Sequence, residues 1–153
     1  MYKWLGFWAL LFWGALFAEE SPAIALTKGF VVLDISSTGI PTWEKELPQG
    51  EKLLVTISAE TCALSSREYV EKVCAKFGKK KERLYRNLGA FHGDQTILQL
   101  LSIDLPSKER VFQAVLKGST KIYVLSFKTK EEAMPLAYKE IAKILASFHL
   151  KVA

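Results

Sequence analysis

The pattern of apolar runs and turn formers along this chain indicates six strands. Strands are expected where β-branched and aromatic residues gather between clusters of turn formers. The segments that meet this condition are residues 30–35, 43–47, 53–58, 96–103, 110–116 and 121–127. Short turn segments separate the last three, which predicts that they run antiparallel as a meander. Their apolar residues fall on both faces of the strands, so these strands need cover on both sides.

The first helix is expected to begin after Ser65. Ser65 and Glu68 have the spacing of a capping box, and Leu64 and Tyr69 have the spacing of a hydrophobic staple around it. An apolar stripe with the i, i+3, i+4, i+7 spacing of a helix follows, made of Val70, Val73, Cys74 and Phe77. This stripe predicts a helix that packs against the sheet.

The second helix is expected near the carboxyl end of the chain. Thr129 and Glu132 have the spacing of a second capping box. Pro135 would remove a hydrogen bond deep in a helix, so the first turn is either kinked from, or separate from, a main helix that starts near Pro135. The apolar stripe consists of Ala137, Ile141, Ile144, Leu145 and Phe148. The chain is therefore expected to end as a helix.

Together these elements predict an α+β fold, in which helices cover both faces of an antiparallel β-sheet. The chain has 153 residues. Without an N-terminal signal segment it has the size of one ordinary domain, large enough to bury a core without metal or disulfide support. We expect a signal peptide in residues 1–25 and a single domain in residues 26–153.

The N-terminal segment has the three parts of an export signal. Lys3 precedes residues 4–17, which carry no charge, and Ala18 is followed by two glutamates. A membrane-spanning helix needs about 20 apolar residues, so this shorter run favours cleavage over anchoring. The retained anchor stays open as an alternative, because large aromatic residues favour membrane interfaces. Those residues are Trp4, Phe7, Trp8 and Trp13.

Two cleavage points fit the signal segment. Cleavage after Ala18 would follow a sequence with the bulky Leu16 two places earlier, whereas Ala25 ends the small-x-small triplet of residues 23–25. Residue size therefore favours cleavage after Ala25 slightly. Either cleavage would deliver the domain to an extracytoplasmic compartment, which is periplasmic in a bacterium with two membranes.

The net charge is +5, with both signs interspersed along the chain. Such a weak excess does not indicate a nucleic-acid partner, but it slightly favours anionic neighbours such as lipid headgroups. One concentrated run of cations stands out as the candidate site for an anionic surface, made of Lys79, Lys80, Lys81, Arg83 and Arg86. The alternative is that these cations are simply solvated or protect an exposed sheet edge on a strand that follows the first helix.

Cysteine and histidine chemistry has little support in the sequence. Cys62 precedes the first helix and Cys74 lies within it, so a rise of about 1.5 Å per residue favours two free thiols. A disulfide between them is the alternative, and it would require the loop at Cys62 to fold back along the helix. Cys62 is the better candidate nucleophile, although no histidine stands near it in sequence. His92 and His149 do not have the spacing of a zinc site. No metal or cofactor is expected.

Three segments resemble the PsbP family and its bacterial DcrB-type relatives. They are residues 41–43 (Pro-Thr-Trp) after a strand, the strand residues 121–125, and Ser147 with Phe148 at the end of the last helix. The resemblance spans roughly residues 30–148 and implies an antiparallel sheet with helices on both sides. It also implies a noncatalytic binding or assembly role, often extracytoplasmic. No ligand-binding or metal-binding residue of photosynthetic PsbP matches a position here, so no photosystem role is implied.

The sequence therefore predicts an exported, noncatalytic binding or assembly protein of the cell envelope. Its partner would be an envelope protein or a small ligand, and an anionic membrane surface is a further candidate. One alternative is a membrane-tethered protein that retains residues 4–17 as an anchor and turns the basic run toward lipid. The other is a thiol-dependent enzyme or redox protein that uses Cys62.

Overall fold

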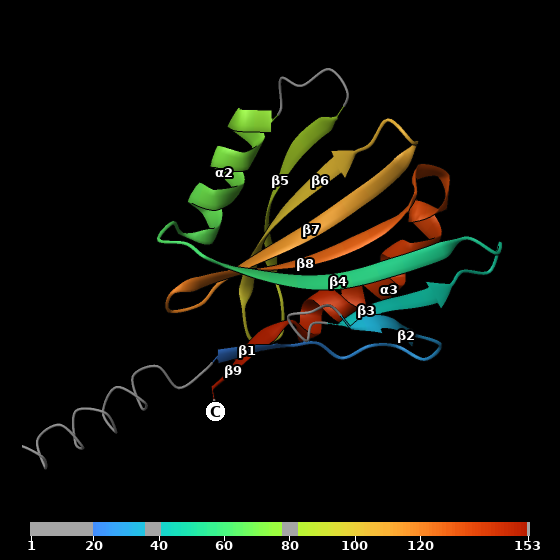
Figure 1. The fold of residues 1–153 in the computed structure, drawn as a ribbon, viewed down its shortest axis with the longest axis horizontal. Helices are drawn as coiled ribbons and strands as arrows, with labels where there is room; N and C mark the ends of the chain where they lie inside the picture. Colours follow the sequence, from blue (N-terminus) through green and yellow to red (C-terminus); the bar gives the residue numbers. More distant parts are fainter. Residues whose placement is uncertain (1–19, 36–40, 78–82, 153) are drawn as a thin grey trace, which may run out of the picture.

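A computed structural model describes residues 20–35, 41–77 and 83–152 of the protein, and its central element is a seven-stranded antiparallel sheet (Figure 1). The strand order is β2-β3-β4-β8-β7-β6-β5. These strands are β2 (Val31–Ile35), β3 (Pro41–Glu46), β4 (Lys52–Thr61), β5 (Leu84–His92), β6 (Ile97–Asp104), β7 (Glu109–Lys117) and β8 (Lys121–Lys130).

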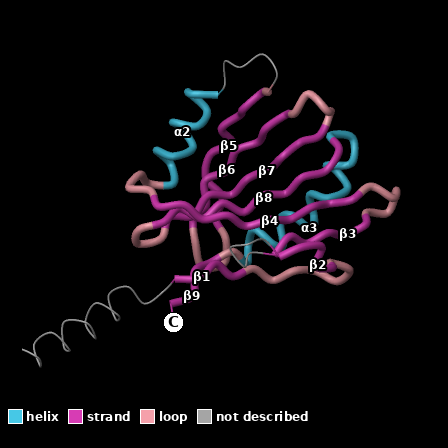
Figure 2. Tube along the Cα trace, viewed as in Figure 1, coloured by secondary structure: helices cyan, strands magenta, loops and turns pink. Residues whose placement is uncertain are grey.

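Two helices and a small second sheet complete the described fold. The helices are α2 (Ser66–Phe77) and α3 (Met134–Ser147), and the short 3-10 helix η1 (Glu131–Ala133) precedes α3. The second sheet pairs β1 (Glu20–Ala23) with β9 (His149–Val152), so the two ends of the described chain lie side by side (Figure 2). None of the described helices is long and apolar enough to cross a membrane.

Buried side chains form two separate cores, because neighbouring residues of a strand point to opposite faces. In β6, Leu100 belongs to the first core and Leu101 to the second. The first core contains the buried face of α3, and the second contains Val70 of α2. The predicted stripe of α3 and its C-cap is buried, and Met134 at the start of the helix is buried with it; the stripe consists of Ala137, Ile141, Ile144, Leu145 and Phe148.

Most of the expected elements are present. The α+β class and the antiparallel meander of β6, β7 and β8 are confirmed. Ser65 caps the start of α2 as expected, since the backbone N–H of Glu68 donates to Ser65 Oγ at 3.1 Å and Ser65 Oγ donates to Glu68 Oε1 at 3.0 Å. Val73 and Cys74 pack against the second core, as the stripe predicts. Both cysteines are free.

The second capping box is wrong. Thr129 belongs to β8, is 2 % exposed and pairs with Arg110 across the ladder, so its hydroxyl does not cap a helix. Lys130 precedes η1 without a side-chain cap. The interpretation of Pro135 is confirmed, because α3 begins at Met134 with a proline in its first turn, where the missing N–H costs little.

The chain does not end as a helix. Phe148 leaves the helical region with φ −68° and ψ 118°, and His149 starts β9 instead of ending α3. The partner of β9 is β1, which lies in the segment assigned to the signal peptide. Pairing with a distant strand gave the last residues an extended structure that local periodicity could not reveal.

Strand β5 is not among the six strands that the apolar pattern predicts. Asn87 and Gly89 interrupt its pattern, and the register with β6 shifts between them. Gly89 has φ +81°, which favours glycine, and its N–H donates to the Asn87 side chain at 2.9 Å. Because β5 forms an edge of the sheet, the suggestion that an edge strand follows the first helix is confirmed.

Candidate functional site

A hollow of about 430 Å³ lies between the β6–β7 turn and the segment that joins β8 to α3. Five residues line it: Ser107, Lys108, Lys130, Glu131 and Glu132. Lys108 adopts φ +63° in the turn, and its carbonyl accepts a hydrogen bond from the Glu131 N–H at 2.9 Å. This bond holds the two walls of the hollow together.

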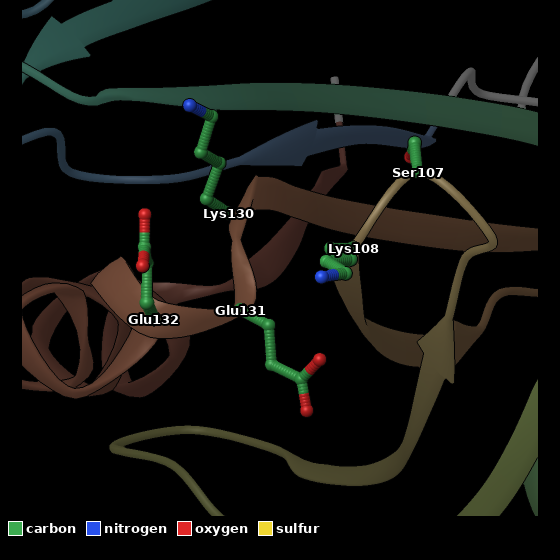
Figure 3. A pocket seen from close by; sticks show the side chains of 5 residues that line it. All are labelled: Ser107, Lys108, Lys130, Glu131 and Glu132. Carbon is green, nitrogen blue, oxygen red and sulfur yellow. The ribbon is translucent and has the colours of Figure 1, made fainter.

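Two of the four charged residues that line the hollow form ion pairs. Glu131 Oε1 lies 2.7 Å from Arg110 Nη2, and Lys130 Nζ lies 3.3 Å from Glu51 Oε1. The side chains of Lys130 and Glu131 point in different directions and do not converge on one point (Figure 3). Ligand pockets usually hold a few polar groups that converge on the ligand, and these two side chains do not converge.

The basic run is only partly described by the structure. Lys79, Lys80 and Lys81 lie outside the described residues. Arg83 is exposed just before β5. Arg86 lies within β5, where its Nη1 is 3.0 Å from Asp104 Oδ2 on the neighbouring strand. Asp104 also accepts from Arg110 Nε at 2.7 Å, so Arg86 belongs to a small ion-pair network on the sheet.

The start of β5 and the N-terminal strand β1 lie on opposite sides of the molecule (Figure 1). The turn after β5 is tied to the end of α3, since the Asp94 N–H donates to the Ala146 carbonyl at 2.9 Å and Thr96 Oγ1 donates to the Phe148 carbonyl at 2.7 Å. β9 begins at that place and pairs with β1. The start of β5 lies roughly 25 Å away along the strand at about 3.3 Å per residue.

The two cysteine thiols lie in different surroundings. Cys74 packs against the second core, and burial raises the pKa of its thiol. Cys62 is half-buried, and the Lys117 ammonium donates to its backbone carbonyl. Burial first, and then a hydrogen bond to Glu60, raise the pKa of the nearby Tyr69 to about 12. The phenol of Tyr69 is therefore protonated at neutral pH and unsuited to act as a base toward Cys62.

The histidines lie on different elements. His92 is exposed at the end of β5, and His149 is half-buried in β9 with Nδ1 2.7 Å from the Ser147 carbonyl oxygen. Within residues 20–35, 41–77 and 83–152, no three His, Cys, Asp or Glu side chains gather in a way that could hold a metal ion.

Two features of the surface were not singled out in the sequence. Val31, Val32 and Leu33 of the edge strand β2 are each more than half exposed. The segment from Glu20 to Thr27 is bonded to the turn before β8 and to α3. The apolar run of β2 is visible in the sequence, but its exposure depends on the order of the strands in the sheet. The bonds of the segment from Glu20 to Thr27 join residues about a hundred positions apart, so the sequence pattern does not reveal them.

Comparison with known proteins gives similarity at the level of structure. No protein-family model matches the chain, and no curated protein matches it. The solution structure of cyanobacterial PsbP (CyanoP) from Synechocystis sp. PCC 6803 matches with a TM-score of 0.55 and 14% identity, covering 88% of this chain and 94% of that one.

A second solved structure resembles the chain to the same extent. It is the crystal structure of LpqN, described as involved in cell envelope biogenesis of Mycobacterium tuberculosis. It matches with a TM-score of 0.55 and 12% identity, covering 88% of this chain and 85% of LpqN. Since both matches extend over most of each chain, they show that this protein has a PsbP-like fold.

Proposed function

We propose that this protein is exported and acts in the cell envelope by binding or assembly, without catalysis. The observation that carries the proposal is the similarity to LpqN, a protein involved in cell envelope biogenesis, over 88% of this chain. The export-type sequence of residues 1–18 supports the same compartment. The two cores, one with α3 and the other with α2, support the layered arrangement of helix, sheet and helix that the resemblance implies.

The partner that we propose is another envelope protein rather than a small ligand. In the hollow near Lys108, Lys130 and Glu131 are paired with Glu51 and Arg110 and do not converge on one point, which disfavours a small ligand held by these charges. Nucleic acid is not proposed, because the net charge is only +5 and arises from interspersed signs.

The arrangement of the termini disfavours the membrane-tethered alternative with a basic lipid-facing patch. An anchor ending at Phe17 would hold the membrane within about 11 Å of Glu20, because three residues of chain span no more than that. Arg83 and Arg86 lie near the far end of β5, roughly 25 Å from the β1–β9 end. The Debye length in physiological salt is about 8 Å, so these cations would be screened from that membrane.

Localisation tests the first half of the proposal. The full chain with a C-terminal tag is expressed in a bacterium, and its N-terminal sequence is determined in the soluble extracytoplasmic, membrane and cytosolic fractions. We expect a processed chain in the extracytoplasmic fraction. An intact Met1 in the cytosol would contradict export, and an intact Met1 in the membrane would favour the anchored alternative.

A rescue experiment tests the second half. A strain that lacks the gene should lose resistance to detergent if the protein serves the envelope. The full chain should restore resistance, whereas a chain that lacks residues 1–18 and stays in the cytosol should not. Cys62→Ala in the full chain is the control for the thiol-dependent alternative and should rescue fully. Equal rescue by the cytosolic chain would contradict an envelope role.

A further inference from the structure

We infer that residues 20–27 form a strap that belongs to the mature domain, so that signal processing occurs at the Ala18–Glu19 bond and not after Ala25. The inference rests on the proposed export of the chain. Residue size alone favours the triplet of residues 23–25 as a cleavage signal. The folded domain, however, uses this triplet and the residues on both sides of it.

Glu20 fixes the beginning of the strap. Its two carboxylate oxygens accept hydrogen bonds from the Ser119 N–H at 3.1 and 2.9 Å, and its carbonyl accepts one from the Tyr123 hydroxyl at 3.1 Å. Tyr123 is buried in the first core. A Cβ atom at Gly118 would overlap the Glu20 carboxylate and lie close to the Tyr123 ring, so a larger residue in the turn before β8 would require these side chains to shift.

The middle of the strap is β1, which gives β9 its partner. The ladder pairs Glu20 with Val152 and Ala23 with His149. Among the described strands, β9 has no other neighbour. A chain that starts at Leu26 would lose β1 and leave the backbone groups of β9 without these bonds.

The end of the strap is bound to α3. The Ala25 N–H donates to Ser147 Oγ at 2.8 Å, and Thr27 Oγ1 donates to Glu140 Oε2 at 2.7 Å. Ile24 and Leu26 pack against the first core. Cleavage after Ala25 would remove Ile24 and convert the Leu26 amide to an ammonium group beside apolar side chains, which is unfavourable.

Cleavage before Glu20 has none of these costs. The mature chain would begin at Glu19, one residue before the strap, and every contact given above would be kept. Of the two processed chains, only the one that begins at Glu19 can form the complete domain, because the chain that begins at Leu26 lacks β1.

The first test is the N-terminal sequence of the full chain after expression in a bacterium. We expect the processed protein to begin at Glu19. A mature protein that begins at Leu26 would overturn the inference. An intact Met1 in the membrane would overturn processing at Ala18, and an intact Met1 in the cytosol would overturn both this processing and the proposed export.

The strap itself is tested independently of export. Chains that start at Glu19 and at Leu26 are produced without a signal, and their thermal unfolding is followed by circular dichroism. We expect the Leu26 chain to melt about 10 °C lower, since about 1 kcal/mol shifts the Tm of a domain this size by a few degrees. In the Glu19 chain, Glu20→Ala should lower the Tm by about 3 °C, and Glu19→Ala is the charge-matched control. Equal melting of the two chains would overturn the strap.

Discussion

Among single residues, Thr129 carries a hydroxyl that the fold leaves in an apolar environment. It is 2 % exposed on β8, and its Oγ1 has no hydrogen-bond partner among the described residues. A buried hydroxyl without a partner costs free energy because it has lost its bonds to water. The local pattern indicated a helix cap, and the length of β8 decided otherwise.

Replacing this hydroxyl should stabilise the protein. Thr129→Val has nearly the same shape and removes the unpaired group, so we expect the free energy of unfolding to rise by about 1 kcal/mol. Urea unfolding at neutral pH measures the change. Thr129→Ser keeps the hydroxyl, loses a methyl group and should destabilise the protein. A Thr129→Val protein less stable than the wild type would mean that the hydroxyl has a bonding partner in solution.

Glu140 on α3 makes stability depend on pH. Burial by itself would raise the pKa of its carboxyl group, but hydrogen bonds from Lys45 and Thr27 and the charge of Lys45 lower it below the usual 4.5. A carboxyl with a lowered pKa in the folded state contributes stability above its unfolded pKa. That contribution is lost as the pH falls below 4.5 through the folded pKa.

Glu140→Gln should therefore destabilise the protein at pH 7 by about 1 kcal/mol and have a smaller effect at pH 3. Urea unfolding of both proteins at a series of pH values gives the difference. Glu71→Gln, which removes an exposed ion pair with Arg67 on α2, is the control and should change stability little at either pH. A constant difference between wild type and Glu140→Gln across this range would contradict the linkage.

At the scale of elements, the two edges of the large sheet differ. β5 is bent by the irregularity at Asn87 and Gly89 and lies against α2. β2 exposes the consecutive apolar residues Val31, Val32 and Leu33, although its register with β3 also shifts after Val32. An exposed apolar edge strand has free backbone groups and favours pairing between chains.

A lysine on this edge should reduce association between copies. We expect Val32→Lys to lower the light scattering of concentrated protein relative to the wild type, because edge lysines oppose strand pairing. Leu136→Lys makes a similar change of charge and polarity on an exposed position of α3, away from the edge, and is the matched control. If both variants lower the scattering equally, general charge and not the edge is responsible.

At the scale of the whole molecule, the β1–β9 sheet joins the two ends of the chain. β1 contacts the turn before β8 through Glu20, and β9 continues from α3 after Phe148. Removing either strand destroys the same ladder. The two deletions should therefore not be additive, because residues that share one set of partners couple strongly.

This coupling can be measured by urea unfolding of truncated chains. From a chain that starts at Glu19, we delete residues up to Ala25, residues after Phe148, or both. We expect the double deletion to lose clearly less stability than the sum of the single deletions. As a control, Ser65→Ala removes the distant cap of α2, costs about 1 kcal/mol, and should add to either deletion. Additive deletions would show that β1 and β9 stabilise the domain separately.

Local patterns in the sequence determined most elements and the fold class. The apolar run in residues 121–127, the cap at Ser65 and the stripe from Ala137 to Phe148 each depend on neighbours within a few positions, so they are readable without a structure. The free state of the two cysteines follows in the same way from the helix between them. The sequence also limited the candidate nucleophilic and metal-binding side chains to two cysteines and two histidines.

Tertiary structure decided what depends on contacts distant in sequence. Thr129 became part of a strand because β7 pairs with it, β9 formed because β1 lies beside it, and Glu20 acquired its role from Ser119, about a hundred residues away. The opposite placement of Arg86 and β1 also follows only from strand order. Local propensity is weaker than such long-range pairing, so these features could not be derived from the residues alone.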